Sequence, residues 1–234
     1  MRQASYQTRR DQLQTYFDHT AVEAWKRLTS EAPVSGIRAT VRAGRDRMRA
    51  TLLGWLPEDL TGARLLDAGC GTGALAREAA RRGAEVIAID LSPKLVAAAR
   101  DVLPLTQGQG SLTYHVGDML DRTLGEFDYV VAMDSLIHYR AEDIAEVLAD
   151  LGARAYVSML FTFAPRTALL TAMHTAGRMF PRAERAPAIE PVSESGMRTA
   201  IARNPALSDW TAERTTRIKA GFYISQAMEL KLRD

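Results

Sequence analysis

The stretch LLDAGCGTGA, residues 65–74, joins an apolar run to a glycine-rich turn and places an aspartate directly before the glycines. A strand, a glycine-rich turn and a helix form an anion-binding arrangement, because the first N–H groups of the helix have no partner within it. Gly69, Gly71 and Ala74 also fit a loose dinucleotide pattern of G-x-G-x-x-G/A, which is a weak signal by itself. The turn alone therefore predicts a nucleotide site without saying which nucleotide.

Asp67 distinguishes between the candidate ligands. A carboxylate beside a pyrophosphate costs on the order of 1 kcal/mol even at a water-like dielectric, and more when it is shielded from solvent. An ammonium or a sulfonium would be stabilised there instead, and S-adenosylmethionine carries both together with an adenosine and no phosphate. We therefore expect Asp67, Gly69, Gly71 and Gly73 to hold the amino-acid end of this ligand, with the glycines letting the backbone approach closely.

Two further acidic residues follow the next predicted strands. Asp90 ends the second strand, where a carboxylate accepts hydrogen bonds from ribose hydroxyls. Asp118 follows the third, where it would accept from the adenine amino group while Met119 packs on the ring. Either aspartate alone could be a turn cap, but three acids at successive strand ends lie on the edge where such sheets bind ligands. The predicted cofactor set is Asp67, Gly69, Gly71, Gly73, Asp90, Leu91, Asp118, Met119 and Met133.

Strands and helices alternate through the middle of the chain. We predict strands at 63–69, 84–90, 111–117, 126–133 and 153–161, and helices at 73–82, 93–102 and 141–150. Runs such as VIAI and YVV are apolar on both faces, as strands buried in a parallel sheet are. Short links between such elements predict a doubly wound α/β sheet with helices on both faces.

The flanks suggest accessory parts around this core. Apolar stripes run from Tyr16 to Leu28 and from Ile37 to Leu52, separated by a break at PVSG (33–36), and a Met-rich stretch covers 164–180. We predict a helical arm or lid (1–60), a core that binds S-adenosylmethionine (61–163), a cap insertion (164–207) and antiparallel strands that complete the core sheet (208–234, with strands at 211–219 and 222–230).

Composition narrows the class of protein. The chain has 234 residues, of which 47% are hydrophobic and 25% charged, and its net charge of +2 argues against nucleic acid as a partner. One cysteine, Cys70, excludes an intrachain disulfide and is interpreted as a small filler. No apolar run has membrane-spanning length and the charged amino terminus is unlike a signal peptide, so we expect a cytoplasmic protein. His19, His115 and His174 show no metal-ligand spacing, and we predict no protein-bound metal.

The motifs DAGCGTG, VIAIDLSPKLVAAAR and GDM resemble those of the class I methyltransferases. This resemblance spans 63–163 and implies a Rossmann-like, seven-stranded, mostly parallel sheet whose seventh strand is inserted antiparallel. The flanking segments YFDHTAVEAWKRL, IRATVRAGRDRM, MDSLIHYR and GFYIS resemble the magnesium protoporphyrin IX methyltransferases of chlorophyll and bacteriochlorophyll synthesis. That family resemblance implies esterification of one propionate under an arm and a cap, with magnesium arriving only inside the porphyrin. It also implies hand-over from the porphyrin-binding subunit of magnesium chelatase and at most peripheral membrane contact.

Two residues are candidates for the chemistry. His138 lies shortly beyond the fourth strand, where it would orient the propionate or remove a proton from its protonated fraction. A carboxylate with a pKa near about 4.3 is already ionised at neutral pH, so no strong base is obligatory. The resemblance carries Tyr16 over as a hydroxyl that closes over the carboxylate. Their plainer interpretations are a loop histidine bonded to the backbone and an aromatic residue of an amphipathic helix.

Other side chains leave alternatives open. Arg42, Arg45 and Arg49 lie near one helical face and could meet the propionates, although solvated surface charge is the better interpretation. Three functions remain: a porphyrin carboxyl methyltransferase, a methyltransferase of a quinone or phenol oxygen, and a non-catalytic module that binds S-adenosylmethionine or RNA.

Overall fold

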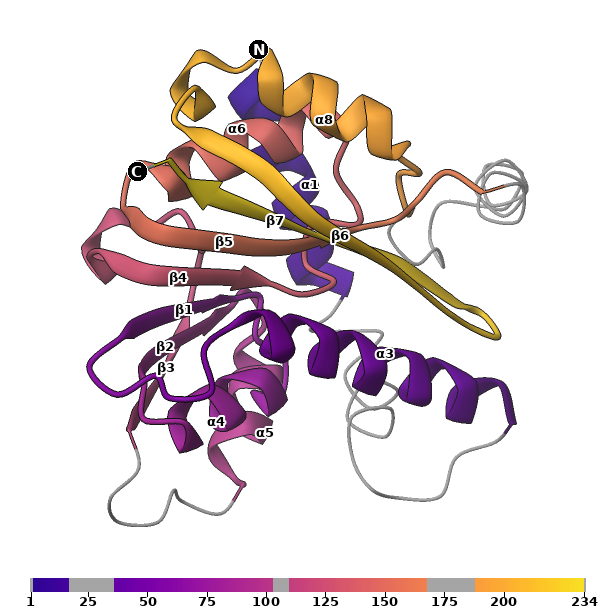
Figure 1. The fold of residues 1–234 in the computed structure, drawn as a ribbon. Helices are drawn as coiled ribbons and strands as arrows, with labels where there is room; N and C mark the ends of the chain where they lie inside the picture. The colour runs from indigo at the N-terminus through magenta and orange to yellow at the C-terminus, as the bar shows by residue number, and fades with distance from the viewer. Residues whose placement is uncertain (1, 17–35, 103–109, 168–187, 234) are drawn as a thin grey trace.

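The computed structural model describes residues 2–16, 36–102, 110–167 and 188–233. Within these ranges seven strands form one sheet in the order β3-β2-β1-β4-β5-β7-β6 (Figure 1). The strands are β1 (Arg64–Ala68), β2 (Glu85–Asp90), β3 (Ser111–Val116), β4 (Phe127–Ala132), β5 (Ala155–Phe163), β6 (Trp210–Ala220) and β7 (Tyr223–Leu232). β1 to β5 pair in parallel, whereas β7 runs antiparallel between β5 and β6. The predicted mostly parallel sheet with an inserted antiparallel strand is confirmed.

Helices cover both faces of the sheet, as predicted. α3 (Gly36–Trp55) and α4 (Ala74–Arg81) share one apolar core with Leu65 and Val86. α6 (Ala141–Gly152) and α8 (Glu194–Ala202) share the other with Leu66, and α5 (Pro93–Arg100) contacts β2 and β3. Successive residues of a strand point to opposite faces, so one buried strand serves both cores.

The helices that follow β1 and β2 begin directly after a glycine with a positive φ and after a capping serine, respectively. The α5 helix starts after Ser92, whose side chain accepts a hydrogen bond from the Leu95 N–H, and Pro93 occupies its first turn. The α4 helix starts after Gly73, which has a φ of 75° that favours glycine. Both helices therefore begin at the carboxyl ends of strands, where the site was predicted.

The helix α3 is part of the sheet's packing. Met48 and Leu52 are fully buried, and α3 contacts β6 and β7. A Cβ atom at Gly44 would lie 2.4 Å from the Tyr223 ring, so the helix approaches β7 as closely as a glycine allows. The predicted apolar stripe from Ile37 to Leu52 is buried at its carboxyl end but not at its start, because Ile37 is 59% exposed.

The structure describes the helix α8 (Glu194–Ala202) but not the segments on which several other predictions fall. The α8 helix was not predicted; Ser193 caps it, and Met197 and Ile201 bury its inner face against the core that includes α6. Several predictions concern residues outside the described ranges. These are most of the stripe from Tyr16 to Leu28, the two histidines His19 and His174, and the Met-rich stretch beyond residue 167. The division of the chain at 60/61, 163/164 and 207/208 stays a prediction.

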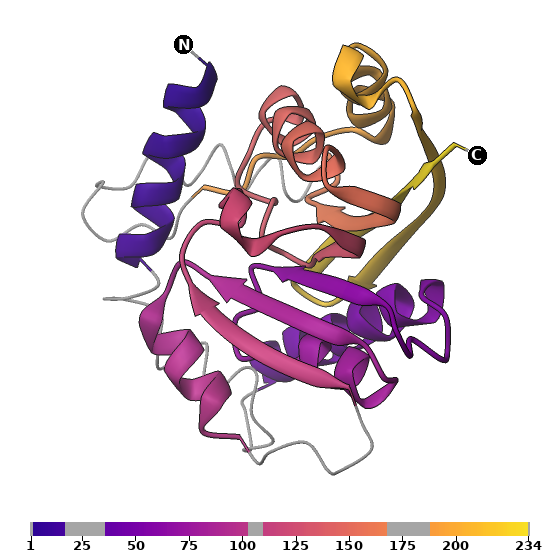
Figure 2. The ribbon, with the colours of Figure 1, turned by 90° about the vertical axis from the view of Figure 1, so that its left-hand side faces the viewer.

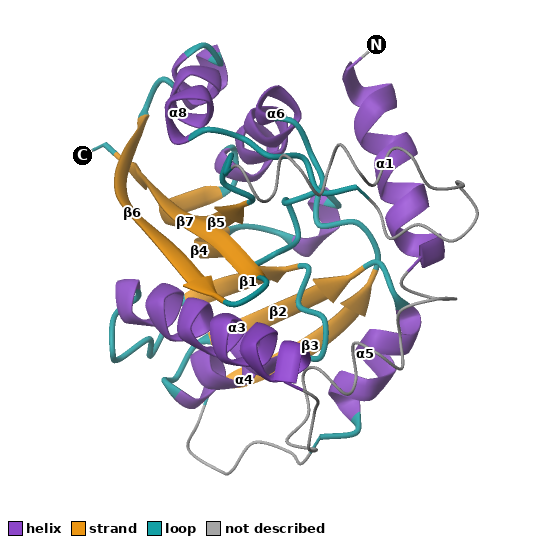
Figure 3. Cartoon of the chain, turned by 90° about the vertical axis from the view of Figure 1, so that its right-hand side faces the viewer, coloured by secondary structure: helices purple, strands orange, loops and turns teal. Residues whose placement is uncertain are grey.

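The helix α1 (Arg2–Tyr16) lies near the carboxyl ends of the parallel strands. Figures 2 and 3 show the arrowheads of β1, β2 and β3 pointing toward this helix. Among the side chains of α1 that the structure describes, Tyr6 and Leu13 are buried, one heptad apart. This helix therefore borders the edge at which the candidate ligand-binding residues gather.

Candidate functional site

A cavity of about 70 Å³ lies at the carboxyl ends of β1 to β4. Every predicted cofactor residue except Asp67 and Gly73 lines it, and so does His138. The predicted set that lines the cavity is Gly69, Gly71, Asp90, Leu91, Asp118, Met119 and Met133. Residues predicted from four separate strand ends thus converge on one place.

The glycine-rich turn is held by backbone hydrogen bonds to the neighbouring strand. The N–H of Gly69 donates to the Ile89 carbonyl at 2.8 Å, and that of Gly71 donates to Asp90 Oδ2 at 2.8 Å. A Cβ atom at Gly69, where φ is 85°, would lie 2.4 Å from Ser135 Cβ, and one at Gly73 would lie 2.2 Å from the Tyr114 hydroxyl oxygen. The glycines therefore allow the turn to approach side chains of the β3 strand and the β4–α6 loop.

Asp67 lies behind this turn and does not line the cavity. Its side chain is buried, and its Oδ2 accepts a hydrogen bond from the Ala76 N–H of α4 at 3.1 Å. Burial raises the pKa of this carboxyl to about 7, although the hydrogen bond from Ala76 opposes the shift. The structure shows Asp67 fixing the turn to the first turn of α4, and its action on a bound cation stays a prediction.

Asp90 ends β2 and lines the cavity. Its Oδ1 accepts from the Ser92 N–H at 2.9 Å, and its Oδ2 accepts from the Gly71 N–H at 2.8 Å. An ionised carboxylate has about four acceptor positions, so these bonds leave it chemically suited to accept from ribose hydroxyls as well. The carboxylate thereby combines the predicted turn-capping role with its place in the cavity.

Asp118 is contacted by α1, which sequence reasoning did not predict. The Tyr6 hydroxyl donates to Asp118 Oδ1 at 2.7 Å, and Arg10 donates to Oδ2 at 3.1 Å. The Tyr6 ring stacks on Tyr139 with centroids 5.3 Å apart. Burial first, and the charge of Asp118 second, raise the pKa of Tyr6, so this hydroxyl stays protonated and acts as a donor. The heptad spacing of Tyr6 and Leu13 is the only sequence signal for this contact.

His138 is buried in the loop between β4 and α6. Its Nδ1 lies 3.2 Å from the Ala188 carbonyl oxygen. Because a carbonyl can only accept, Nδ1 carries the proton of this hydrogen bond, and Nε2 is the acceptor nitrogen of the neutral ring. The side chain is thus bonded to the backbone, as the plainer interpretation held, and it also lines the cavity.

Asp134 is the centre of a hydrogen-bond network that sequence reasoning missed. Arg45 of α3 donates to its Oδ2 at 2.8 Å, while Tyr223 and Ser225 of β7 donate to its Oδ1 at 3.1 Å and 3.2 Å. The Asp134 N–H donates to Thr162 Oγ1 of β5 at 2.7 Å. This network ties the start of the β4–α6 loop to three other elements. The signal was available, since Asp134 follows the fourth strand as Asp118 follows the third.

The remaining candidates are spread more widely. Arg45 is not solvated surface charge, because its side chain is 17% exposed and pairs with the buried Asp134; that interpretation was wrong for this residue. Arg49 pairs with Asp46 at 2.8 Å in a more exposed position. Tyr16 ends α1 half-buried and does not line the cavity, so its predicted role stays a prediction. Burial raises the pKa of the Cys70 thiol, consistent with an inert filler.

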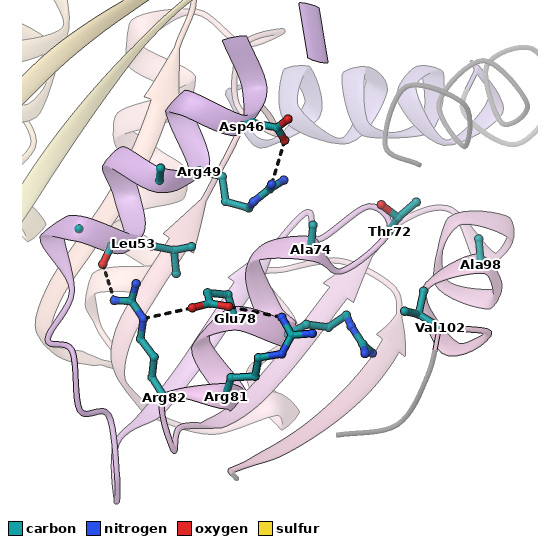
Figure 4. A pocket seen from close by; sticks show the side chains of 13 residues that line it. Asp46, Arg49, Leu53, Thr72, Ala74, Glu78, Arg81, Arg82, Ala98 and Val102 are labelled. Carbon is teal, nitrogen blue, oxygen red and sulfur yellow. Dashed lines mark hydrogen bonds and ion pairs between the residues drawn. The ribbon is translucent and has the colours of Figure 1, made fainter. Parts of the chain in front are cut away.

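A larger hollow of about 750 Å³ lies elsewhere, between α3, α4 and the end of α5 (Figure 4). None of the predicted cofactor-binding or catalytic residues lines it, although the candidate Arg49 does. Arg49 pairs there with Asp46, and Arg81 and Arg82 both pair with Glu78. We therefore place the candidate active site in the smaller cavity, where the predicted residues meet. Among the described residues, no helix is both long and apolar enough to cross a membrane.

Comparisons with known proteins show which family this chain is similar to. A family model described as "Magnesium-protoporphyrin IX methyltransferase C-terminus" matches residues 132–232, and a methyltransferase domain model matches residues 65–154. The chain is 47% identical to the magnesium-protoporphyrin O-methyltransferase of Rhodobacter capsulatus over 97% of this chain and 99% of that protein. It is similar to the crystal structure of magnesium protoporphyrin IX methyltransferase from Synechocystis with bound SAH, with a TM-score of 0.82, 27% identity, and coverage of 97% of this chain and 100% of that one.

A different methyltransferase matches only part of the chain. The ubiquinone biosynthesis O-methyltransferase of Xanthomonas oryzae is 45% identical over 83 residues, which is 34% of this chain and 34% of that protein. The likeness to this protein therefore covers about a third of either chain.

Proposed function

The chain belongs to the magnesium protoporphyrin IX methyltransferase family, and from this premise we propose that it methylates one propionate carboxylate of magnesium protoporphyrin IX to give the monomethyl ester. The methyl donor is S-adenosylmethionine, and the step belongs to chlorophyll or bacteriochlorophyll synthesis. The observation that carries the proposal is the likeness to the Rhodobacter capsulatus protein along nearly the whole length of both chains. The flanking segments share that likeness, and these are the parts that distinguish methyltransferases of different substrates.

The residues of the cavity fit S-adenosylmethionine. The glycine-rich turn offers close backbone approach, Asp90 and Asp118 offer acceptors, and the Ser135 hydroxyl is buried without a hydrogen-bond partner among the described residues. The cavity volume of about 70 Å³ is below the roughly 300–1,000 Å³ of most ligand pockets, so the cavity has to widen for binding; Tyr6 and Leu13 of α1 are among the residues that line it. When bound, S-adenosylmethionine supplies an electrophilic methyl group on a sulfonium.

The residues of the protein act on the propionate that accepts the methyl group. A propionate with a pKa near about 4.3 is ionised at neutral pH, so the protein mainly has to position it and exclude water. We propose that His138 Nε2 accepts the proton of any protonated propionate, because Nδ1 is fixed as a donor to Ala188. Tyr16, as the family resemblance implies, closes over the carboxylate from the end of α1.

A direct test offers labelled S-adenosylmethionine with magnesium protoporphyrin IX, metal-free protoporphyrin or a quinol. We expect label in the magnesium porphyrin; label only in the quinol would overturn the substrate while leaving the donor site intact.

The His138→Asn variant tests the acceptor further. With a carboxylate acceptor we expect a partial loss of kcat that eases little as the pH rises. A phenol with a pKa near about 10 would instead require a base, so turnover would nearly vanish at neutral pH and recover at high pH. Full recovery at high pH would contradict the carboxylate assignment. Binding of S-adenosylhomocysteine by the variant serves as the control for an intact cofactor site.

The proposed substrate also bears on where the protein works and on how the porphyrin reaches it. The substrate is large and apolar, which favours direct hand-over from the porphyrin-binding subunit of magnesium chelatase. We propose a cytoplasmic protein with at most peripheral contact to a membrane and no nucleic-acid partner.

A further inference from the structure

The hydroxyl of Ser135 is a polar group for which the protein itself offers no partner. Its Oγ is buried, and among the described residues it makes no hydrogen bond. A buried hydroxyl without a partner loses its hydration and gains nothing in return, so such groups in native proteins call for an explanation. Ser135 also lines the cavity at the strand ends. We propose that its hydroxyl binds the amino-acid end of the cofactor, an inference that rests on the proposed function.

The surrounding packing fixes the hydroxyl in place. Ser135 lies directly against the glycine-rich turn, where a Cβ atom at Gly69 would be 2.4 Å from Ser135 Cβ and 3.1 Å from Ser135 Oγ. The preceding residue, Asp134, has a φ of 56°, which is uncommon for a residue other than glycine, and its carboxylate is held by α3 and β7. A residue clamped between this network and Gly69 has little freedom to turn its hydroxyl elsewhere. The Ser135 hydroxyl is therefore held in position before the ligand binds.

The order of the strands says which end of the cofactor Ser135 would meet. β3, β2, β1 and β4 are neighbours in that order. Asp118 and Met119 follow β3 and Asp90 ends β2, so an adenosine bound by these residues occupies the β3 and β2 ends. The rest of the ligand then extends over β1 and β4. Ser135 lies in the loop after β4 and faces Gly69 after β1, which is where the amino-acid end would lie.

The chemistry of a hydroxyl suits this group. An amino acid at neutral pH presents a carboxylate that only accepts hydrogen bonds and an ammonium that only donates them. A serine hydroxyl can both donate and accept, so it can bond either group. Asp134, its neighbour, is already engaged by Arg45, Tyr223 and Ser225. Ser135 is therefore the side chain at this point of the cavity whose hydrogen-bonding capacity the structure leaves unused among the described residues.

The test uses two ligands that differ only at this end. S-adenosylhomocysteine has the amino-acid portion, whereas 5′-methylthioadenosine keeps the adenosine and sulfur without it. For Ser135→Ala we expect about a tenfold or greater loss of affinity for S-adenosylhomocysteine and less than a twofold change for 5′-methylthioadenosine, measured by calorimetry. The ligand-free variant should unfold at the same temperature as the wild type or higher, because an unpaired hydroxyl has been removed.

A matched control and the contrary outcomes complete the experiment. Ser158→Ala removes another buried serine hydroxyl, from β5 and outside the cavity lining, and should leave the ratio of the two affinities unchanged. Equal losses for both ligands, no loss for either, or a less stable ligand-free Ser135→Ala protein would each overturn the inference. Unchanged S-adenosylhomocysteine affinity with a raised porphyrin KM would assign the hydroxyl to the acceptor instead. If the wild-type protein binds neither ligand, the proposed function fails before Ser135 is tested.

Discussion

Replacing Asp67 by asparagine tests the electrostatics of the glycine-rich turn. The variant keeps an oxygen that can accept from the Ala76 N–H, removes the charge, and replaces the second carboxylate oxygen by an NH2 group. Burial raises the pKa of Asp67 from its ordinary 3.8 to about 7, and a tenfold change in an equilibrium corresponds to about 1.4 kcal/mol. Ionised Asp67 therefore costs the ligand-free fold about 4 kcal/mol, and Asp67→Asn removes that cost.

The sign of the pH dependence follows from where the proton is held. Below about pH 4 the carboxyl is protonated in both the folded and unfolded states, so the variant and the wild type should be similarly stable. Between about pH 4 and 7 the unfolded chain releases the proton while the folded protein keeps it, so the wild type loses stability as the pH rises. The stability gained by Asp67→Asn should therefore grow by about 3 kcal/mol between pH 5 and pH 8.

Urea unfolding of both ligand-free proteins at pH 5 and pH 8 measures this difference. A gain of equal size at the two pH values, or none at either, would refute the raised pKa. At pH 8 the variant should also bind S-adenosylmethionine more weakly, since the anion that favours a sulfonium and an ammonium is gone. Unchanged affinity would refute the prediction that Asp67 acts on the ligand.

Three further substitutions test the packing around the site. Gly69→Ala should abolish S-adenosylhomocysteine binding in calorimetry, because φ at this position is 85° and the new methyl group would collide with Ser135; retained affinity would contradict the close approach. Tyr6→Phe removes the hydrogen bond to Asp118 while keeping the ring, and we expect a loss of about 1–2 kcal/mol in chemical unfolding; unchanged stability would mean that α1 does not rest on this bond. Gly44→Ala should cost about 1–3 kcal/mol in the same assay, because its methyl group would lie 2.4 Å from a ring atom of β7, and a neutral result would show that α3 can shift away.

The sheet could be predicted because its signals are local. Fully apolar runs identify buried strands, and polar residues that follow each strand must meet at one edge of a parallel sheet. This logic placed Asp90, Asp118 and His138 together, and it would have found Asp134 if applied to the fourth strand. Alternation along β1 also predicts that Asp67 shares a face with Leu65, which packs in the core of α4, so its place behind the turn was accessible as well.

The contacts of α1 could not be predicted in the same way. Tyr6 contacts Asp118 across 112 residues of sequence, and the described side chains of α1 include only two buried ones as a signal. Such a contact depends on how the helix lies across the strand ends, which periodicity does not specify. The ion pair of Arg45 could not be predicted for the same reason. Its charge suggested a solvent-exposed side chain, whereas its partner Asp134 lies in a loop far along the chain.

The position of β7 affects how the protein is made. Among the described strands β7 is synthesised last, yet it lies between β5 and β6 and supplies two of the groups that hold Asp134. A nascent polypeptide that has emerged only as far as β6 has an open gap in its sheet, with backbone groups on β5 able to recruit a foreign strand. Catalytic competence and protection from aggregation are therefore acquired together, when translation has released the residues up to 232.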